Sequence, residues 1–204
     1  MAEKAFNEAE RYLIQNWTKA RTLEESMDAV RQKYWGLASA IAEAVQAKNT
    51  ALDWQLVYVH HTSGEGGIGI AKNAWPEVGG YKLGFYVANL RLELLAAEAE
   101  DENRPYACVW TKPASRIRIG MSEVNRAILA ASRNVLTADE RKRCEKEEEA
   151  PVWYYLPETR EQLHAMLLEG DGQRFVECIV PHFELLTRFT PTLDKILSKA
   201  GGKK

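Results

Sequence analysis

Cysteine is scarce in this chain. Three occur among 204 residues, and Cys108, Cys144 and Cys178 are too far apart to form a Cys-x-x-Cys pair. An odd number of widely spaced cysteines is typical of free thiols in a reducing compartment rather than of a disulfide framework. We therefore expect a cytoplasmic protein that folds without disulfide bonds.

Long apolar runs and an excess of basic charge are also missing. No stretch approaches the ~18 consecutive apolar residues of a membrane span, so no membrane partner is expected. The first six residues (MAEKAF) are not followed by the apolar core of a secretion signal. The net charge of −2 argues against nucleic-acid binding by bulk charge, although it leaves room for a local basic patch.

Common catalytic signatures are absent too. The chain has no G-x-S-x-G elbow and no H-E-x-x-H pair. The segment 109–112 (VWTK) has Trp110 where a restriction-type nuclease needs a carboxylate. The residues match no family's motif set, indicate no metal site and leave the cofactor undetermined.

What is present is the composition of an ordinary globular protein. Hydrophobic residues make up 46% of the chain and charged residues 27%, which argues against general disorder. We predict a single α+β domain over residues 1–200 and a flexible tail at 201–204. In it, an N-terminal helical hairpin (3–48) precedes a small, mostly antiparallel sheet (about 54–120), and a C-terminal helical bundle (121–198) follows.

Two helices are predicted before residue 50. Apolar residues three and four apart indicate a first helix over 3–19. Thr22-Leu-Glu-Glu25 matches a capping box, which predicts a second helix over 23–48. In the second helix a heptad seam is formed by Met27, Val30, Tyr34, Leu37 and Ile41. The seam is either the packing face of a hairpin within the domain or a homodimer interface.

The remaining elements follow from shorter patterns. Strands are predicted at 54–61, 68–72, 81–87, 105–111 and 115–120, and a helix at 88–102. Ser122 is expected to cap a helix, and Thr137 opens a capping box with Glu140. Further helices are predicted over residues 122–135, 138–149, 157–170, 174–189 and 190–197. Pro181 is expected to kink the helix over 174–189.

A pair of histidines beside glycines is the first candidate site. His60 and His61 end the first predicted strand, and Glu65 follows in the loop. These three are candidate catalytic residues because histidine titrates near neutral pH. However, neighbouring side chains on a strand point to opposite faces, so one histidine in the core and one in solvent is the alternative.

The same loop resembles a nucleotide-binding motif in its spacing alone. Gly64, Gly66 and Gly69 fit G-x-G-x-x-G, and Lys72 follows, so these four are candidate ligand-binding residues. The partner motifs of kinases, Rossmann domains and P-loops are absent. A plain hairpin loop is the alternative.

A basic set is the second candidate site. Lys112, Arg116, Arg118, Arg126 and Arg133 lie close together in the sequence, with Tyr106 and Trp110 nearby. Arginines beside aromatic residues can bind phosphates and stack on bases. Alternatively, these arginines pair with the acidic runs of the same chain.

Two hypotheses of function follow. The first is a non-enzymatic binding module that forms homo-oligomers through the 23–48 helix, binds a protein partner, or contacts nucleic acid through the arginines. The second is a small metal- or nucleotide-dependent hydrolase or transferase that uses the loop between His60 and Lys72.

Overall fold

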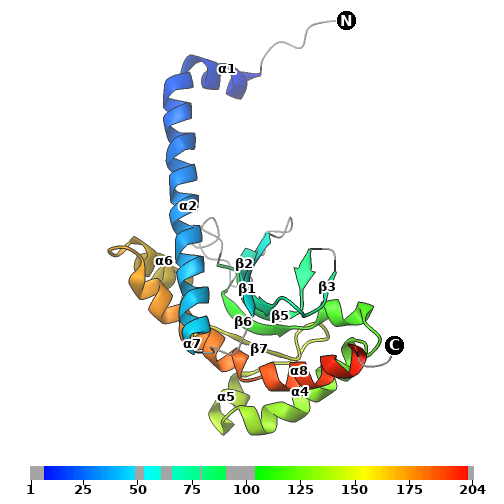
Figure 1. The fold of residues 1–204 in the computed structure, drawn as a ribbon. Helices are drawn as coiled ribbons and strands as arrows, with labels where there is room; N and C mark the ends of the chain where they lie inside the picture. The colour runs from blue at the N-terminus through cyan, green and yellow to red at the C-terminus, as the bar shows by residue number, and fades with distance from the viewer. Residues whose placement is uncertain (1–6, 49–52, 61–65, 79, 91–103, 202–204) are drawn as a thin grey trace, which may run out of the picture. The chain divides into compact units, whose positions relative to one another are not determined.

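The computed structural model describes residues 7–48, 53–60, 66–78, 80–90 and 104–201 (Figure 1). Within these ranges it has seven α-helices, a five-stranded antiparallel sheet and a two-stranded sheet, which confirms the predicted α+β class. The chain divides into two compact units, Met1–Gly36 and Leu37–Lys204. No helix in the described ranges is long and apolar enough to cross a membrane.

The five-stranded sheet has the order β1-β2-β5-β6-β7, and each strand is antiparallel to its neighbours. Branched and aromatic residues dominate it, as β-propensity requires. A separate small hairpin joins β3 (Glu77–Val78) to β4 (Tyr81–Lys82). The sheet strands are β1 (Trp54–His60), β2 (Gly66–Lys72), β5 (Gly84–Ala88), β6 (Tyr106–Trp110) and β7 (Val152–Tyr155).

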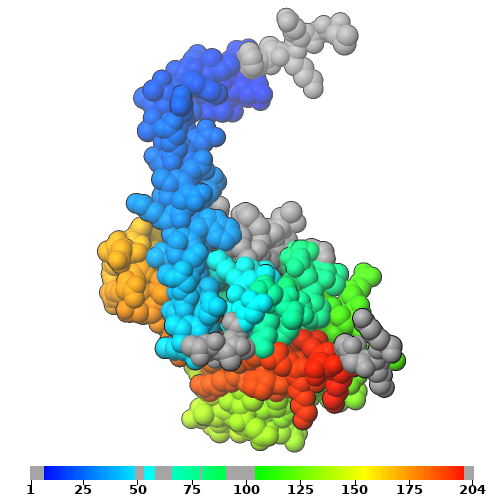
Figure 2. Space-filling model, in the orientation of Figure 1, coloured from blue at the N-terminus to red at the C-terminus, as the bar shows by residue number. Residues whose placement is uncertain are grey.

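Helices pack against this sheet in the second unit. Helix α7 contacts β5 and β6, and α4 contacts α8, which lie side by side in Figure 2. The core-facing stripe of α7 is fully buried at Phe175, Ile179 and Phe183. The helices are α4 (Met121–Val135), α5 (Ala138–Arg143), α6 (Arg160–Leu168), α7 (Gln173–Thr187) and α8 (Thr190–Gly201).

A group of three aromatic rings fills one part of the core. Trp54 of β1, Trp75 and Phe85 of β5 have ring centroids 5.4–5.6 Å apart, and Trp75 meets the other two edge-on. Such edge-to-face pairs add about 0.5–1.5 kcal/mol beyond the burial of area. Two of the six tryptophans are therefore explained by packing.

The N-terminal helices begin and end differently from the prediction. Helix α1 is Glu8–Gln15 and α2 is Trp17–Lys48, with a break at Asn16. The capping box is formed by Asn7 and Glu10, not by Thr22 and Glu25. Thr22 lies inside α2, where its hydroxyl donates to the carbonyl of Thr18 at 3.0 Å. Helix α2 already begins at Trp17, so Thr22 and Glu25 lie inside it and do not stand at a helix start.

Three predictions between residues 112 and 149 are also wrong. Residues 115–120 are not a strand, because Pro113 occupies the first turn of a 3-10 helix, η2 (Lys112–Arg116), where its missing N–H is tolerated. Gly120 rather than Ser122 precedes α4, with a φ of 80°. Helix α5 ends at Arg143, since Cys144 is extended and Glu145 bridges to Trp153 of β7.

The remaining predictions are mostly confirmed. Thr137 and Glu140 form the predicted capping box of α5. Pro181 lies within α7. Helix α6 starts at Arg160 after a capping box of Thr159 and Gln162, three residues later than predicted. The helix expected at 88–102 lies almost wholly outside the described residues.

Candidate functional site

The N-terminal unit carries an unusual set of exposed apolar side chains. In the described range 7–36, Tyr34 is the only buried residue. Leu23 is 62% exposed, Met27 47% and Val30 51%. Tyr12 and Leu13 of α1 are similarly exposed. We call Tyr12, Leu13, Leu23, Met27 and Val30 the N-terminal apolar face.

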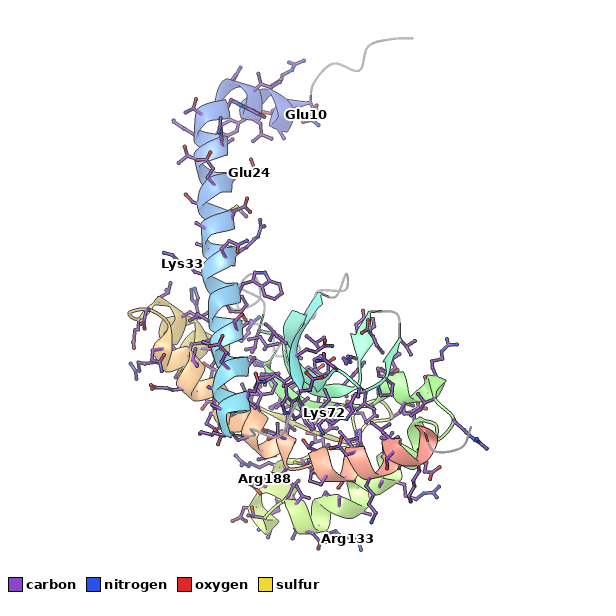
Figure 3. All side chains as sticks on the ribbon, viewed as in Figure 1. Glu10, Glu24, Lys33, Lys72, Arg133 and Arg188 are labelled. Carbon is purple, nitrogen blue, oxygen red and sulfur yellow. The ribbon has the colours of Figure 1, made fainter. Side chains whose placement is uncertain are left out.

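A groove in this unit is lined by most of that face. It has a volume of about 440 Å³ and lies between α1 and the first turns of α2, with Tyr12, Leu13, Leu23 and Met27 on its walls. Lys19, Glu24 and Arg31 stand around it; Glu24 is labelled in Figure 3. An apolar groove with charges of both signs at its rim has the general composition of a protein-binding surface.

The second half of α2 is different. Ala38, Ile41 and Val45 are fully buried, and Leu37 is half-buried. Leu37 packs directly on Gly172, where an added Cβ would come within 2.7 Å of its Cδ1. Lys48 forms an ion pair with Glu184 of α7. The predicted seam is therefore used within the chain at Leu37 and Ile41, whereas Met27 and Val30 remain exposed.

The glycines of the predicted nucleotide loop are partly explained by packing. Gly66 and Gly69 belong to β2 and are buried, and Gly67 lies between them. A Cβ at Gly67 would lie 2.4 Å from the carbonyl oxygen of Val87, and one at Gly69 would lie 2.3 Å from a ring carbon of Tyr86. Both glycines let β5 approach closely. His61, Gly64 and Glu65 lie outside the described residues.

The backbones of His60 and Lys72, the other two candidates from this loop, lie within the described residues. His60 ends β1 opposite Gly66, and its side chain lies outside what the structure describes. Lys72, at the end of β2 (Figure 3), forms an ion pair with Asp194 of α8. The indole N–H of Trp75 donates to the same carboxylate at 3.0 Å. Lys72 thus joins the sheet to α8.

The structure divides the predicted basic set into separate places. Lys112 lies 2.7 Å from Glu149 and stands over the ring of Trp110. The Glu149 carboxylate raises the pKa of Lys112. Arg116 is in η2 and Arg118 just after it, and both are exposed. Arg126 and Arg133 both lie on α4, and they line a second groove that the other three do not reach.

A buried polar cluster was not foreseen from the sequence. The Tyr154 hydroxyl lies 3.1 Å from Nδ1 of His182, and the Glu158 carboxylate lies 3.5 Å from its Nε2. Burial lowers the pKa of His182, although Glu158 opposes that shift. Burial and then Glu158 raise the pKa of Cys178 to about 12. A thiol in this state is a poor nucleophile, so the cluster does not resemble an activated cysteine site.

Sequence signals for this cluster were weak. Cys178 and His182 are four residues apart on α7, which places them on one helical face. Tyr154 lies in β7, and Glu158 lies in the connection that follows it. No sequence pattern pairs either residue with α7. Among the described residues, no group of three or more histidine, cysteine, aspartate or glutamate side chains is arranged to hold a metal ion.

Comparisons with known proteins give no functional assignment. No protein-family model, no curated protein and no solved structure matches the chain.

Proposed function

We propose that this protein is a non-enzymatic binding module that self-associates through its N-terminal apolar face. The observation that carries the proposal is the concentration of exposed apolar side chains at one end of the chain. Ten large hydrophobic residues are exposed in the described ranges, and eight of them lie between Tyr12 and Trp35. Monomeric proteins rarely expose large apolar side chains in such a cluster without a partner.

The length of the helices supports this proposal. Helix α1 has eight residues, and an isolated helix shorter than about 12–15 residues is marginal in water. Helices in proteins gain most of their stability from packing an apolar face. The exposed face of α1 and of the first half of α2 would supply that packing when it is covered.

A second copy of the chain is the partner that the pattern favours. Leu23, Met27 and Val30 follow the heptad spacing of helices that pair side by side. In an antiparallel pair of α2 helices centred between Met27 and Asp28, Glu24 of one copy faces Arg31 of the other. A two-fold axis creates that opposite-charge contact twice.

The enzymatic alternative has no specific support among the described residues. The β2 glycines have a packing role, and Lys72 is paired with Asp194.

The first test replaces apolar side chains of the face. We expect the wild-type chain to sediment as a dimer in the micromolar range. Leu23→Glu with Met27→Glu should raise the dimer dissociation constant at least about tenfold, because four carboxylates would be placed in an apolar interface. Ala29→Glu with Gln32→Glu is the matched control, since it adds the same charge to the opposite, exposed side of α2. A monomeric wild type, or equal loss in both variants, would contradict the proposal.

The second test examines orientation. Glu24→Arg alone should weaken the dimer severalfold, because two Arg31 side chains would then meet like charges. Adding Arg31→Glu restores opposite charges and should recover most of the affinity. If the double variant is as weak as the single one, the antiparallel register is wrong even though the face itself is used.

A further inference from the structure

A second groove lies on the other unit, between α4 and the segment that connects α5 to β7. Its volume is about 540 Å³, which lies within the range of about 300–1,000 Å³ common for small-molecule sites. Helix α4 forms one wall, and residues 144–146 with Pro151 form the other. Glu145 is fixed there by two backbone hydrogen bonds to Trp153, of 2.7 and 3.3 Å, so the wall is held by the sheet.

The charge in this groove is strongly one-sided. Four cationic side chains line it, and Glu145 is its one carboxylate. The dipole of α4 places about half a negative charge at its C-terminus, which offsets only a small part of this positive charge. The cations are Arg126, Arg133, Arg141 and Lys146.

None of these four cations forms an ion pair with a carboxylate among the described residues. Arg174 and Arg188 elsewhere do form such pairs. Arg126 and Arg133 are two helical turns apart on α4 and exposed, and Arg133 projects at the surface of α4 (Figure 3). Uncompensated arginines on one wall of a groove favour an anionic ligand.

Arg141 is held in place before any ligand arrives. Its Nη1 donates to the carbonyl oxygens of Arg133 and Leu136, at 2.8 and 2.5 Å, at the end of α4. The guanidinium has five N–H donors, so Nε and Nη2 keep theirs for another acceptor. A fixed guanidinium fork suits the paired oxygens of a phosphate and loses little entropy on binding.

Apolar residues from both walls also line the groove: Leu129 and Ala130 from α4, and Pro151 and the buried Val152 from the other side. We call these four residues the apolar floor. An inorganic ion would gain nothing from such a floor. A ligand with an anionic end and a flat apolar part would use both the cations and the floor.

We propose that this groove binds a phosphate-bearing ligand of nucleotide size. The phosphates would contact the guanidinium groups of Arg126, Arg133 and Arg141, and the ring would lie on the apolar floor. A free nucleotide and a nucleotide within a single strand present this same chemistry. The site is separate from the N-terminal apolar face and does not depend on self-association.

Binding to the full-length chain tests the proposal. The probes are ATP, a short labelled single-stranded oligonucleotide, inorganic phosphate and a poly-glutamate peptide, each titrated by anisotropy or calorimetry. We expect ATP or the oligonucleotide to bind, and Arg126→Ala with Arg133→Ala to raise the dissociation constant at least about tenfold, because charge-assisted hydrogen bonds are lost. Lys146→Ala should weaken binding less. Binding should also weaken as salt increases.

The matched control is Arg116→Ala with Arg118→Ala, which removes the same charge outside the groove. It should change affinity less than about twofold, and melting curves of every variant establish that each is folded. Binding of ATP alone identifies a free nucleotide as the source, and tighter binding of the oligonucleotide identifies a strand. The proposal is overturned if neither probe binds, if poly-glutamate or phosphate alone binds as tightly, or if the control loses as much affinity as the groove variant.

Discussion

The two halves of α2 carry the same apolar spacing and have different surroundings. Met27 and Val30 are half exposed, whereas Ile41 and Val45, on the continuing stripe, are fully buried. Leu37 and Lys48 contact Gly172 and Glu184 of the same unit. The contrast shows that a heptad pattern identifies the face of a helix that needs a partner, but not which partner covers it.

The largest effect should come from shortening matched side chains in the two halves. Ile41→Ala should lower the free energy of unfolding by about 2–5 kcal/mol, because it leaves a cavity at a fully buried position. Met27→Ala should change it by less than about 0.5 kcal/mol when the chain is monomeric. Chemical denaturation at low protein concentration measures both. A large loss for Met27→Ala would mean that this residue is already packed within the chain.

Two glycine substitutions should change the free energy of unfolding by smaller amounts and in opposite directions. Gly69→Ala should destabilise by about 1–3 kcal/mol, because its Cβ would overlap Tyr86 and the carbonyl of Val57. Gly36→Ala, with no atom within 4 Å of the added Cβ, should stabilise α2 by about 0.5–1 kcal/mol. Thermal melts of both variants check this. A stabilising Gly69→Ala would contradict the close approach of β2 and β5 at this position.

The smallest effect concerns acid sensitivity, which should be confined to the second unit. Because burial lowers the pKa of His182 below its ordinary value of 6.5, the unfolded chain binds more protons there. Stability should therefore fall as the pH drops through about 6.5 towards the folded-state pKa, with Tm decreasing by roughly 1–4 °C. His182→Asn should reduce this dependence.

His164→Asn is the control for that experiment. It removes a histidine from α6 and keeps the contacts of His182 with Tyr154 and Glu158, so a loss of slope found only in His182→Asn assigns the pH dependence to His182. A slope that is unchanged in His182→Asn would show that other groups cause the acid sensitivity. The N-terminal apolar face carries no histidine, so dimer affinity should not follow the same curve.

Sequence patterns predicted the elements that depend on local chemistry. The capping box at Thr137 and the strands around Trp54 and Tyr106 were predicted because their signals are contained in a few neighbouring residues. The strand at 115–120 was wrong because alternation of Ile117 and Ile119 says nothing about the turn that Pro113 starts. The end of α5 also depends on a tertiary contact, the antiparallel β-bridge between Glu145 and Trp153.

The candidate sites were less accessible to sequence reasoning. Arg126 and Arg133 could be placed on one helix face from their spacing. Arg141 and Lys146 join them only because the chain returns to β7 after α5, and no local pattern encodes that return. The contacts among Tyr154, Glu158 and His182 arise in the same way, from a sheet strand that meets a helix about 25 residues later.

The three cysteines have a practical consequence for labelling chemistry. Cys108 is buried, burial raises the pKa of Cys144, and burial and then Glu158 raise that of Cys178. Only the thiolate reacts quickly with maleimides, so all three native thiols should label slowly at neutral pH. A cysteine introduced at the exposed Ala29 should react much faster. A spin label or fluorophore placed there would measure the distance between two copies of α2 in a chain that keeps all its native cysteines.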